Sequence, residues 1–107
     1  MKKSLPFFVL LICLNCYAQD ESANDLLRQG VDEISNNNYG DAIPLLKESA
    51  SIARESGNKR VLGKAYANLG SIYLKTENTA EALKNYLLAL PALKDAHDNL
   101  GIANTSK

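Results

Sequence analysis

Apolar residues recur every three or four positions along four consecutive segments of the chain, which predicts four amphipathic helices. These helices are expected over residues 22–36, 40–55, 59–75 and 80–96, with one more helix beginning near Asn99. No segment alternates apolar and polar residues in steps of two, the pattern of a half-buried strand. The fold class is therefore predicted to be all-α.

Polar turn-forming residues separate the predicted helices. Asn38 or its neighbour is expected to cap the second helix, and Gly57 to end it in the left-handed backbone region. Thr79 is expected to cap the fourth helix. Pro44 lies near the start of its helix, where it costs little, whereas Pro91 is expected to kink the fourth helix late.

The two halves of the chain resemble each other with a period of 40 residues. Gly30 aligns with Gly70, and Ala42 aligns with Ala82. A fixed period of about 20–50 residues is typical of a solenoid, in which each unit buries its apolar face only against its neighbours. Because a solenoid presents an extended surface, this pattern points to binding as the kind of work the chain does.

Residues 1–18 are interpreted as a secretory signal peptide. A basic start is followed by an apolar run from Leu5 to Leu14 and by the small residue Ala18 before a polar stretch. The run is shorter than the roughly 20 residues that a spanning helix needs. Residues 19–107 are then the mature domain, exported to the periplasm or outside a Gram-negative bacterium, with no membrane span.

The two cysteines permit two other interpretations of this segment. A lipid anchor needs a small residue before the modified Cys, but Ile12 precedes Cys13 and Asn15 precedes Cys16, so lipoprotein anchoring is not expected. A redox or zinc pair needs further ligands or a folded context, which an apolar leader does not provide. We interpret the pair as incidental, and the mature chain then has neither a disulfide nor a thiol nucleophile.

Charge and candidate chemistry argue against nucleic-acid binding and catalysis. Loss of Lys2 and Lys3 from 12 basic residues leaves 10 against 12 acidic ones, a net charge of −2, which is too weak and mixed for a nucleic-acid surface. His97 is the only histidine, and neither a ligand set nor a nucleophile accompanies it. We therefore expect no enzyme activity, no metal and no cofactor.

The third and fourth predicted helices resemble the tetratricopeptide repeat. The matching residues, which follow the spacing of that family, are Tyr66, Leu69, Gly70, Tyr73, Ala82, Tyr86 and Ala89. The first unit is a weaker copy that keeps Gly30 and Ala42 but has Leu26 and Leu46 in place of the aromatic residues. The period exceeds the usual one of about 34 residues, as in the long-period repeats of bacterial signalling proteins.

The resemblance covers residues 22–107 and implies a right-handed α-solenoid of antiparallel helix pairs. It implies two full repeats and the start of a third, with Gly70 and Ala82 where the helices of a pair cross closely. Because the chain stops at Lys107, inside the first helix of that third unit, we interpret it as truncated at its C-terminus. The exposed end of the third unit would then be available for self-association.

In this family the first helix of each pair lines a concave groove that usually binds peptides. Carried over by position, the groove residues would be Asn24, Leu27, Arg28, Val31, Lys64, Ala67, Asn68, Ser71, Lys75, Asn104 and Lys107. Lys64, Asn68 and Lys107 resemble in type the groups that hold a peptide's C-terminal carboxylate. Ammonium and amide donors on one face suit carboxylates or peptide carbonyls.

Two functions follow from the resemblance. The first is an exported scaffold that binds a protein or peptide partner through the groove. The alternative is the N-terminal sensory segment of a bacterial histidine kinase or transcription regulator. The coding sequence beyond Lys107 would separate them, since further repeats favour a scaffold and a spanning helix with a kinase or DNA-binding domain favours signalling.

Overall fold

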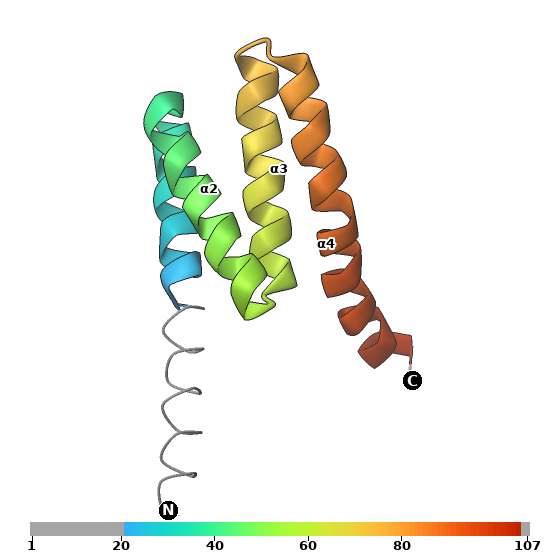
Figure 1. Cartoon of the computed structure of the whole chain (residues 1–107). Coiled ribbons are helices and arrows are strands. Elements are labelled where there is room, and N and C mark those ends of the chain that lie inside the picture. Colours follow the sequence, from blue (N-terminus) through green and yellow to red (C-terminus); the bar gives the residue numbers. More distant parts are fainter. Residues whose placement is uncertain (1–20, 106–107) are drawn as a thin grey trace, which may run out of the picture.

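A computed structural model describes the backbone of residues 21–105 and the side chains of residues 21–96. All regular structure in this part of the chain is helical. Residues 21–35 form the first helix, followed by α2 (Tyr39–Ser56), α3 (Lys59–Lys75) and α4 (Thr79–Thr105). The predicted all-α class is confirmed, and each helix lies antiparallel to the one before it (Figure 1).

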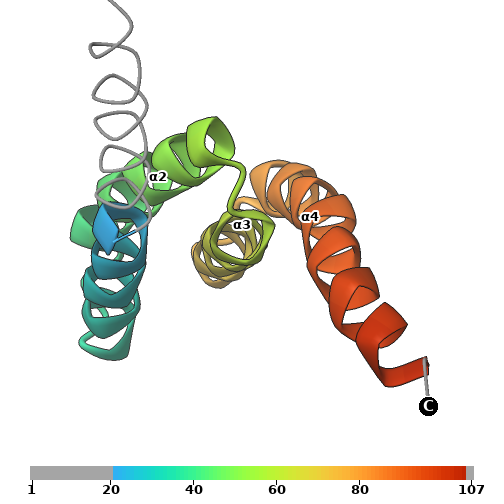
Figure 2. The same cartoon turned by 90° about the horizontal axis from the view of Figure 1, so that it is seen from below.

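The helices form two pairs that lie side by side. The first helix pairs with α2, and α3 pairs with α4, so that the first helix and α4 occupy opposite ends of the array (Figures 1 and 2). The middle helix α3 contacts both α2 and α4. This arrangement agrees with the expected stack of helix pairs.

The three connections between helices share one backbone design. Each contains a residue with positive φ, 63° at Asn37, 75° at Gly57 and 64° at Glu77, and each of these residues precedes an asparagine. The prediction that Gly57 ends the second helix in the left-handed region is therefore confirmed. The same conformation at Asn37 and Glu77 was not expected, because neither residue is a glycine.

Backbone hydrogen bonds close each turn and satisfy carbonyl groups at the end of the preceding helix. The donors are the N–H groups of Asn38, Asn58 and Asn78, and the acceptors are the carbonyl oxygens of Glu33 (2.8 Å), Ala53 (2.8 Å) and Tyr73 (2.7 Å). The pattern recurs every 20 residues, which is half of the period seen in the sequence. Each turn is thus defined by backbone groups rather than by a particular side chain.

The asparagine after each left-handed residue precedes the next helix. Asn58 accepts a hydrogen bond from the backbone N–H of Val61 at 3.2 Å, as an N-cap does. Asn38 occupies the predicted N-cap position of α2, but its side chain makes no capping hydrogen bond. Thr79 is the first residue of α4, so the prediction that it caps this helix is wrong by one position.

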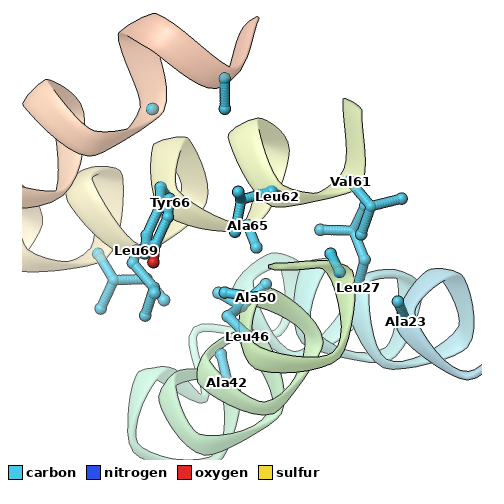
Figure 3. Close-up of a cluster of buried hydrophobic side chains, with 14 residues drawn as sticks. Ala23, Leu27, Ala42, Leu46, Ala50, Val61, Leu62, Ala65, Tyr66 and Leu69 are labelled. Atoms are coloured by element: carbon cyan, nitrogen blue, oxygen red, sulfur yellow. The ribbon is translucent and has the colours of Figure 1, made fainter. Parts of the chain in front are cut away.

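The core lies on both sides of α3 and reaches the first helix (Figure 3). The buried apolar side chains of α3 are Val61, Leu62, Ala65, Tyr66, Leu69 and Ile72. Leu46 of α2 is also fully buried, and burial of each Leu, Ile or Val contributes roughly 1.5–3 kcal/mol. A buried Ser49 hydroxyl donates to the Ala23 carbonyl at 2.7 Å and joins α2 to the first helix.

Glycines admit a large side chain between the helices of each pair. A Cβ at Gly30 would lie 2.7 Å from Leu46 Cδ2, and a Cβ at Gly70 would lie 3.0 Å from ring atoms of Tyr86. Leu46 and Tyr86 are equivalent positions of the two units, so both pairs use the same contact. The carbonyl oxygen of Ala42 also lies 3.7 Å from the Gly30 Cβ position, which places Ala42 near the crossing.

A second close approach, between Gly63 and Leu93, occurs only in the pair of α3 and α4. A Cβ at Gly63 would lie 2.7 Å from Leu93 Cγ and 3.1 Å from the Leu93 backbone nitrogen. The equivalent residues of the first unit are Ala23 and Ala53, both fully buried. The two units therefore fill the same place with side chains of different size. The second unit has a leucine opposite a glycine, and the first unit has two alanines.

The predicted end of the fourth helix is wrong. We expected it to end at residue 96 and a new helix to begin near Asn99, whereas α4 continues through Pro91 to Thr105. Extending α4 keeps the backbone hydrogen bonds of the helix. A separate helix over residues 97–105 would be short, because isolated helices of fewer than about 12–15 residues are only marginally stable in water.

The contact between Gly63 and Leu93 can be tested with a double-mutant cycle. Gly63→Ala should destabilise the chain by about 1–3 kcal/mol, because the new methyl group overlaps the Leu93 side chain and approaches its backbone. The double variant Gly63→Ala/Leu93→Ala should lose less than the sum of the single variants, since it reproduces the two alanines of the first unit. Urea unfolding of the four proteins measures these differences.

Gly40→Ala is the control for this cycle. It also lies in a helix, but nothing lies within 4 Å of its Cβ position. Alanine there should leave stability unchanged or raise it by up to about 1 kcal/mol. Equal losses at Gly40 and Gly63, or strict additivity in the cycle, would contradict the proposed overlap.

Candidate functional site

A hollow of about 490 Å³ lies between the first helix and α3. We call it the groove, and its walls are formed by Glu21, Asn24, Asp25, Leu27, Arg28, Val31, Lys64 and Asn68. The residues from the first helix share one face because they recur at intervals of three and four. Lys64 and Asn68 face the same hollow from α3 because they are four positions apart.

The groove combines an apolar floor with charged and amide groups at its rim. Leu27 is 9% exposed and belongs to the core, whereas Val31 is 38% exposed and offers an apolar contact to a ligand. Both side chains are presented by the same face of the first helix. A ligand side chain placed there would bury apolar surface without disturbing the packing below.

The charged groups of the groove differ in how they are paired. Arg28 donates to the carboxylate of Asp25 in an ion pair at the surface. Asn68 donates through its amide nitrogen to the Lys64 backbone carbonyl at 2.8 Å. The Lys64 ammonium is exposed and forms no ion pair within residues 21–96. Lys64 is therefore the cation of the groove that is most available to a carboxylate.

Six of the residues expected to line the groove lie around it together. They are Asn24, Leu27, Arg28, Val31, Lys64 and Asn68. The two acidic residues Glu21 and Asp25 were missed in the sequence. Asp25 could have been found, because a carboxylate three positions before Arg28 on a helix is well placed to pair with it.

The remaining expected positions do not line this hollow. Ala67 and Ser71 are half-buried elsewhere on α3. The ammonium of Lys75 lies 5.9 Å from the centroid of the Tyr39 ring, beside the turn that leads into α2. Asn104 and Lys107 lie outside the residues whose side chains are described.

A second hollow, of about 320 Å³, lies where α2, α3 and α4 meet. Arg54 donates to the Tyr66 hydroxyl there, and its guanidinium carbon lies 5.8 Å from the Tyr66 ring centroid. Because Tyr66 is only 7% exposed, this contact ties α2 to the central helix. Lys47, Glu81 and Lys84 also line the second hollow.

Neither hollow contains an arrangement for metal chemistry. Among residues 21–96, no three His, Cys, Asp or Glu side chains are placed to hold a metal ion. The helices that could be searched in the described part are also too short or too polar to cross a membrane. What the groove provides is hydrogen-bonding groups, one unpaired cation and a small apolar contact.

Comparison with known proteins agrees with the observed helix pairs. The family model described as Tetratricopeptide repeat matches residues 22–95, which include both helix pairs up to the last turns of α4. No curated protein and no solved structure matches the chain significantly. Repeats of this family generally mediate protein–protein interaction. With the match extending over more than half of its length, the chain belongs to the tetratricopeptide repeat family.

Proposed function

We propose that this chain is an exported interaction module that binds a segment of a partner protein in the groove. The observation that carries the proposal is the position of the unpaired Lys64 beside Asn68 and opposite Val31 in one hollow. A peptide carries carboxylates, carbonyls and apolar side chains, and each finds a suitable group there. The partner class is consistent with the family to which the chain belongs.

The charges of the groove favour a partner segment of mixed charge. Lys64 suits a carboxylate, either of an acidic side chain or of a chain end. On the first-helix side of the same hollow Asp25 is paired with Arg28, and Glu21 is the carboxylate that suits a basic residue of the ligand. We infer that a bound segment lies across the groove, with its acidic group toward α3 and its basic group toward the first helix.

We also propose that residues 1–18 direct export and are removed after Ala18. The basic start, the apolar run and the small residue before the polar stretch support this proposal. The groove would then face the periplasm or the medium.

Charge reversal at Lys64 tests the groove. Peptides would be selected from a random library for binding to the chain, and their affinities measured by fluorescence anisotropy. Lys64→Glu should weaken binding about tenfold or more, because it replaces the available cation with a like charge for the ligand carboxylate. The exposed position of Lys64 means that the fold should be unaffected.

Lys84→Glu is the matched control, because it makes the same charge change at the second hollow. Its affinity for the selected peptides should stay within about twofold of the original, as expected for a charge outside the contact region. Peptides that bind Lys64→Glu as tightly as the original chain would place the binding surface elsewhere.

Export can be tested by expressing the full sequence in a Gram-negative host. The protein should appear in the periplasmic fraction with Gln19 as its first residue, as N-terminal sequencing would show. Ala18→Arg should leave the leader attached, because signal cleavage needs a small residue before the cut. Recovery of the chain from the cytosol with its N-terminal segment intact would contradict the proposal.

A further inference from the structure

The outward face of α4 carries a row of exposed apolar residues. Ala80, Leu83, Leu87 and Leu90 lie along one side of the helix and are called here the outer stripe. Leu83 is 60% exposed, Leu87 is 57% exposed and Leu90 is 62% exposed. Three leucines in one row make a contiguous apolar patch, which on a protein surface generally marks an interaction site.

The internal repeat shows what normally covers such a face. The residues 40 positions before Leu83 and Leu90 are Ile43 and Ala50 of α2. Ala50 is 3% exposed and Ile43 packs against the core, on the helix that α3 contacts. Leu83 and Leu90 of the outer stripe are therefore equivalent to positions at a helix–helix interface, whereas Ala80 and Leu87 are equivalent to the exposed Gly40 and Lys47. No helix covers the outer stripe in the described part of the chain.

The side chains of the outer stripe differ from those of the internal interface. Leu87 and Leu90 replace Lys47 and Ala50. The small Ala50 lines the second hollow together with Tyr66 of α3, whereas a leucine at that place would occupy the space beside the ring. The outer stripe thus suits a partner helix with interdigitating leucines, at the usual separation of about 8–10 Å, better than it suits a copy of α3.

The spacing of the outer stripe is the same in both chain directions. Its members follow one another at intervals of three, four and three residues. An antiparallel copy of α4 would therefore match it, with Leu83 opposite Leu87 of the second copy and Ala80 opposite Leu90. Such a contact is related by a two-fold axis and closes on itself, as the commonest homodimer interfaces do.

The charges at the two ends of the outer stripe favour the antiparallel direction. The exposed Glu77 lies three residues before the stripe, and the exposed Lys94 lies four residues after it. Glu77 lies in the turn just before α4, so in an antiparallel pair Lys94 of one copy lies at the same end of the contact as this turn of the second copy. A parallel pair would instead place the two Lys94 side chains together, and like charges repel.

No helix of the part that the structure describes covers the outer stripe. The helix continues past Lys94 to Thr105 without turning back, and the first helix lies at the opposite end of the array (Figure 2). We propose that two copies of this chain associate through their outer stripes as an antiparallel, two-fold symmetric dimer. Because the stripe spans only about three helical turns, the dimer should be weak, with a Kd in the micromolar range of roughly 1–100 μM.

Sedimentation equilibrium of the full chain over a range of concentrations tests the proposal. A reversible dimer should form, and Leu83→Lys/Leu87→Lys should weaken it at least about tenfold by placing like charges in the contact. Leu88→Lys is the control, because Leu88 is 43% exposed on the same helix but lines the second hollow. Circular dichroism would check that each variant keeps its helical content.

A charge swap tests the direction of the pair. Lys94→Glu and Glu77→Lys should each weaken the dimer several-fold. The expected effect is modest because the ion pair is exposed, but the two-fold symmetry makes each substitution break two such pairs. The two changes together should restore it, because they rebuild the pair with its charges exchanged. Loss of association in the combined variant would overturn the antiparallel arrangement.

Two further outcomes would overturn the dimer itself. One is a chain that stays monomeric up to about 1 mM, well above the expected Kd. The other is association that Leu83→Lys/Leu87→Lys leaves unchanged. Association through the apolar run at residues 5–14 would give this result. The proposed peptide site lies between the first helix and α3, whereas the dimer contact lies on α4. Failure of the dimer test would therefore not contradict peptide binding, and failure of the peptide test would not contradict the dimer.

Discussion

The burial of α3 on two sides is the interaction on which the remaining structure depends. Among the labelled helices of the described part, α2 and α4 each pack closely against α3, whereas their own backbones do not approach each other as closely. Leu69 and Ile72 are almost fully buried, and Tyr66 is fixed by Arg54 of α2. Both helix pairs are joined through this one helix, so its side chains determine the shape of the whole array, and they also position Lys64 and Asn68 in the groove.

The sequence predicted well those features that depend on spacing within one helix. The four helices and the left-handed Gly57 follow from apolar periodicity and from the residues beside it, whereas the groove positions came from the resemblance to the repeat family and, as binding residues, stay a prediction. Six of the groove positions line one hollow between the first helix and α3. Sequence patterns within one helix were therefore sufficient to predict the features that depend on a single helix.

The features that sequence reasoning missed depend on contacts between helices. The end of α4 was misplaced because the 40-residue period places a turn near residues 97–99, whereas α4 continues through these residues to Thr105. The pairing of Gly63 with Leu93 could not be predicted from the sequence. Only the close approach of the two helices shows that Leu93 occupies the space that a side chain at position 63 would need. The left-handed Glu77 was unexpected for a different reason, since its conformation comes from the backbone hydrogen bonds of the turn.

The self-contained turns have a consequence for how such a chain can change in length. Asn37, Gly57 and Glu77 adopt one conformation despite their different side chains, and backbone groups close each connection. A duplicated helix pair would therefore bring its own connections with it, although its packing against α4 would still depend on the side chains of the outer stripe. Growth by whole pairs keeps every helix in its original direction, whereas the gain of a single helix would reverse all those after it.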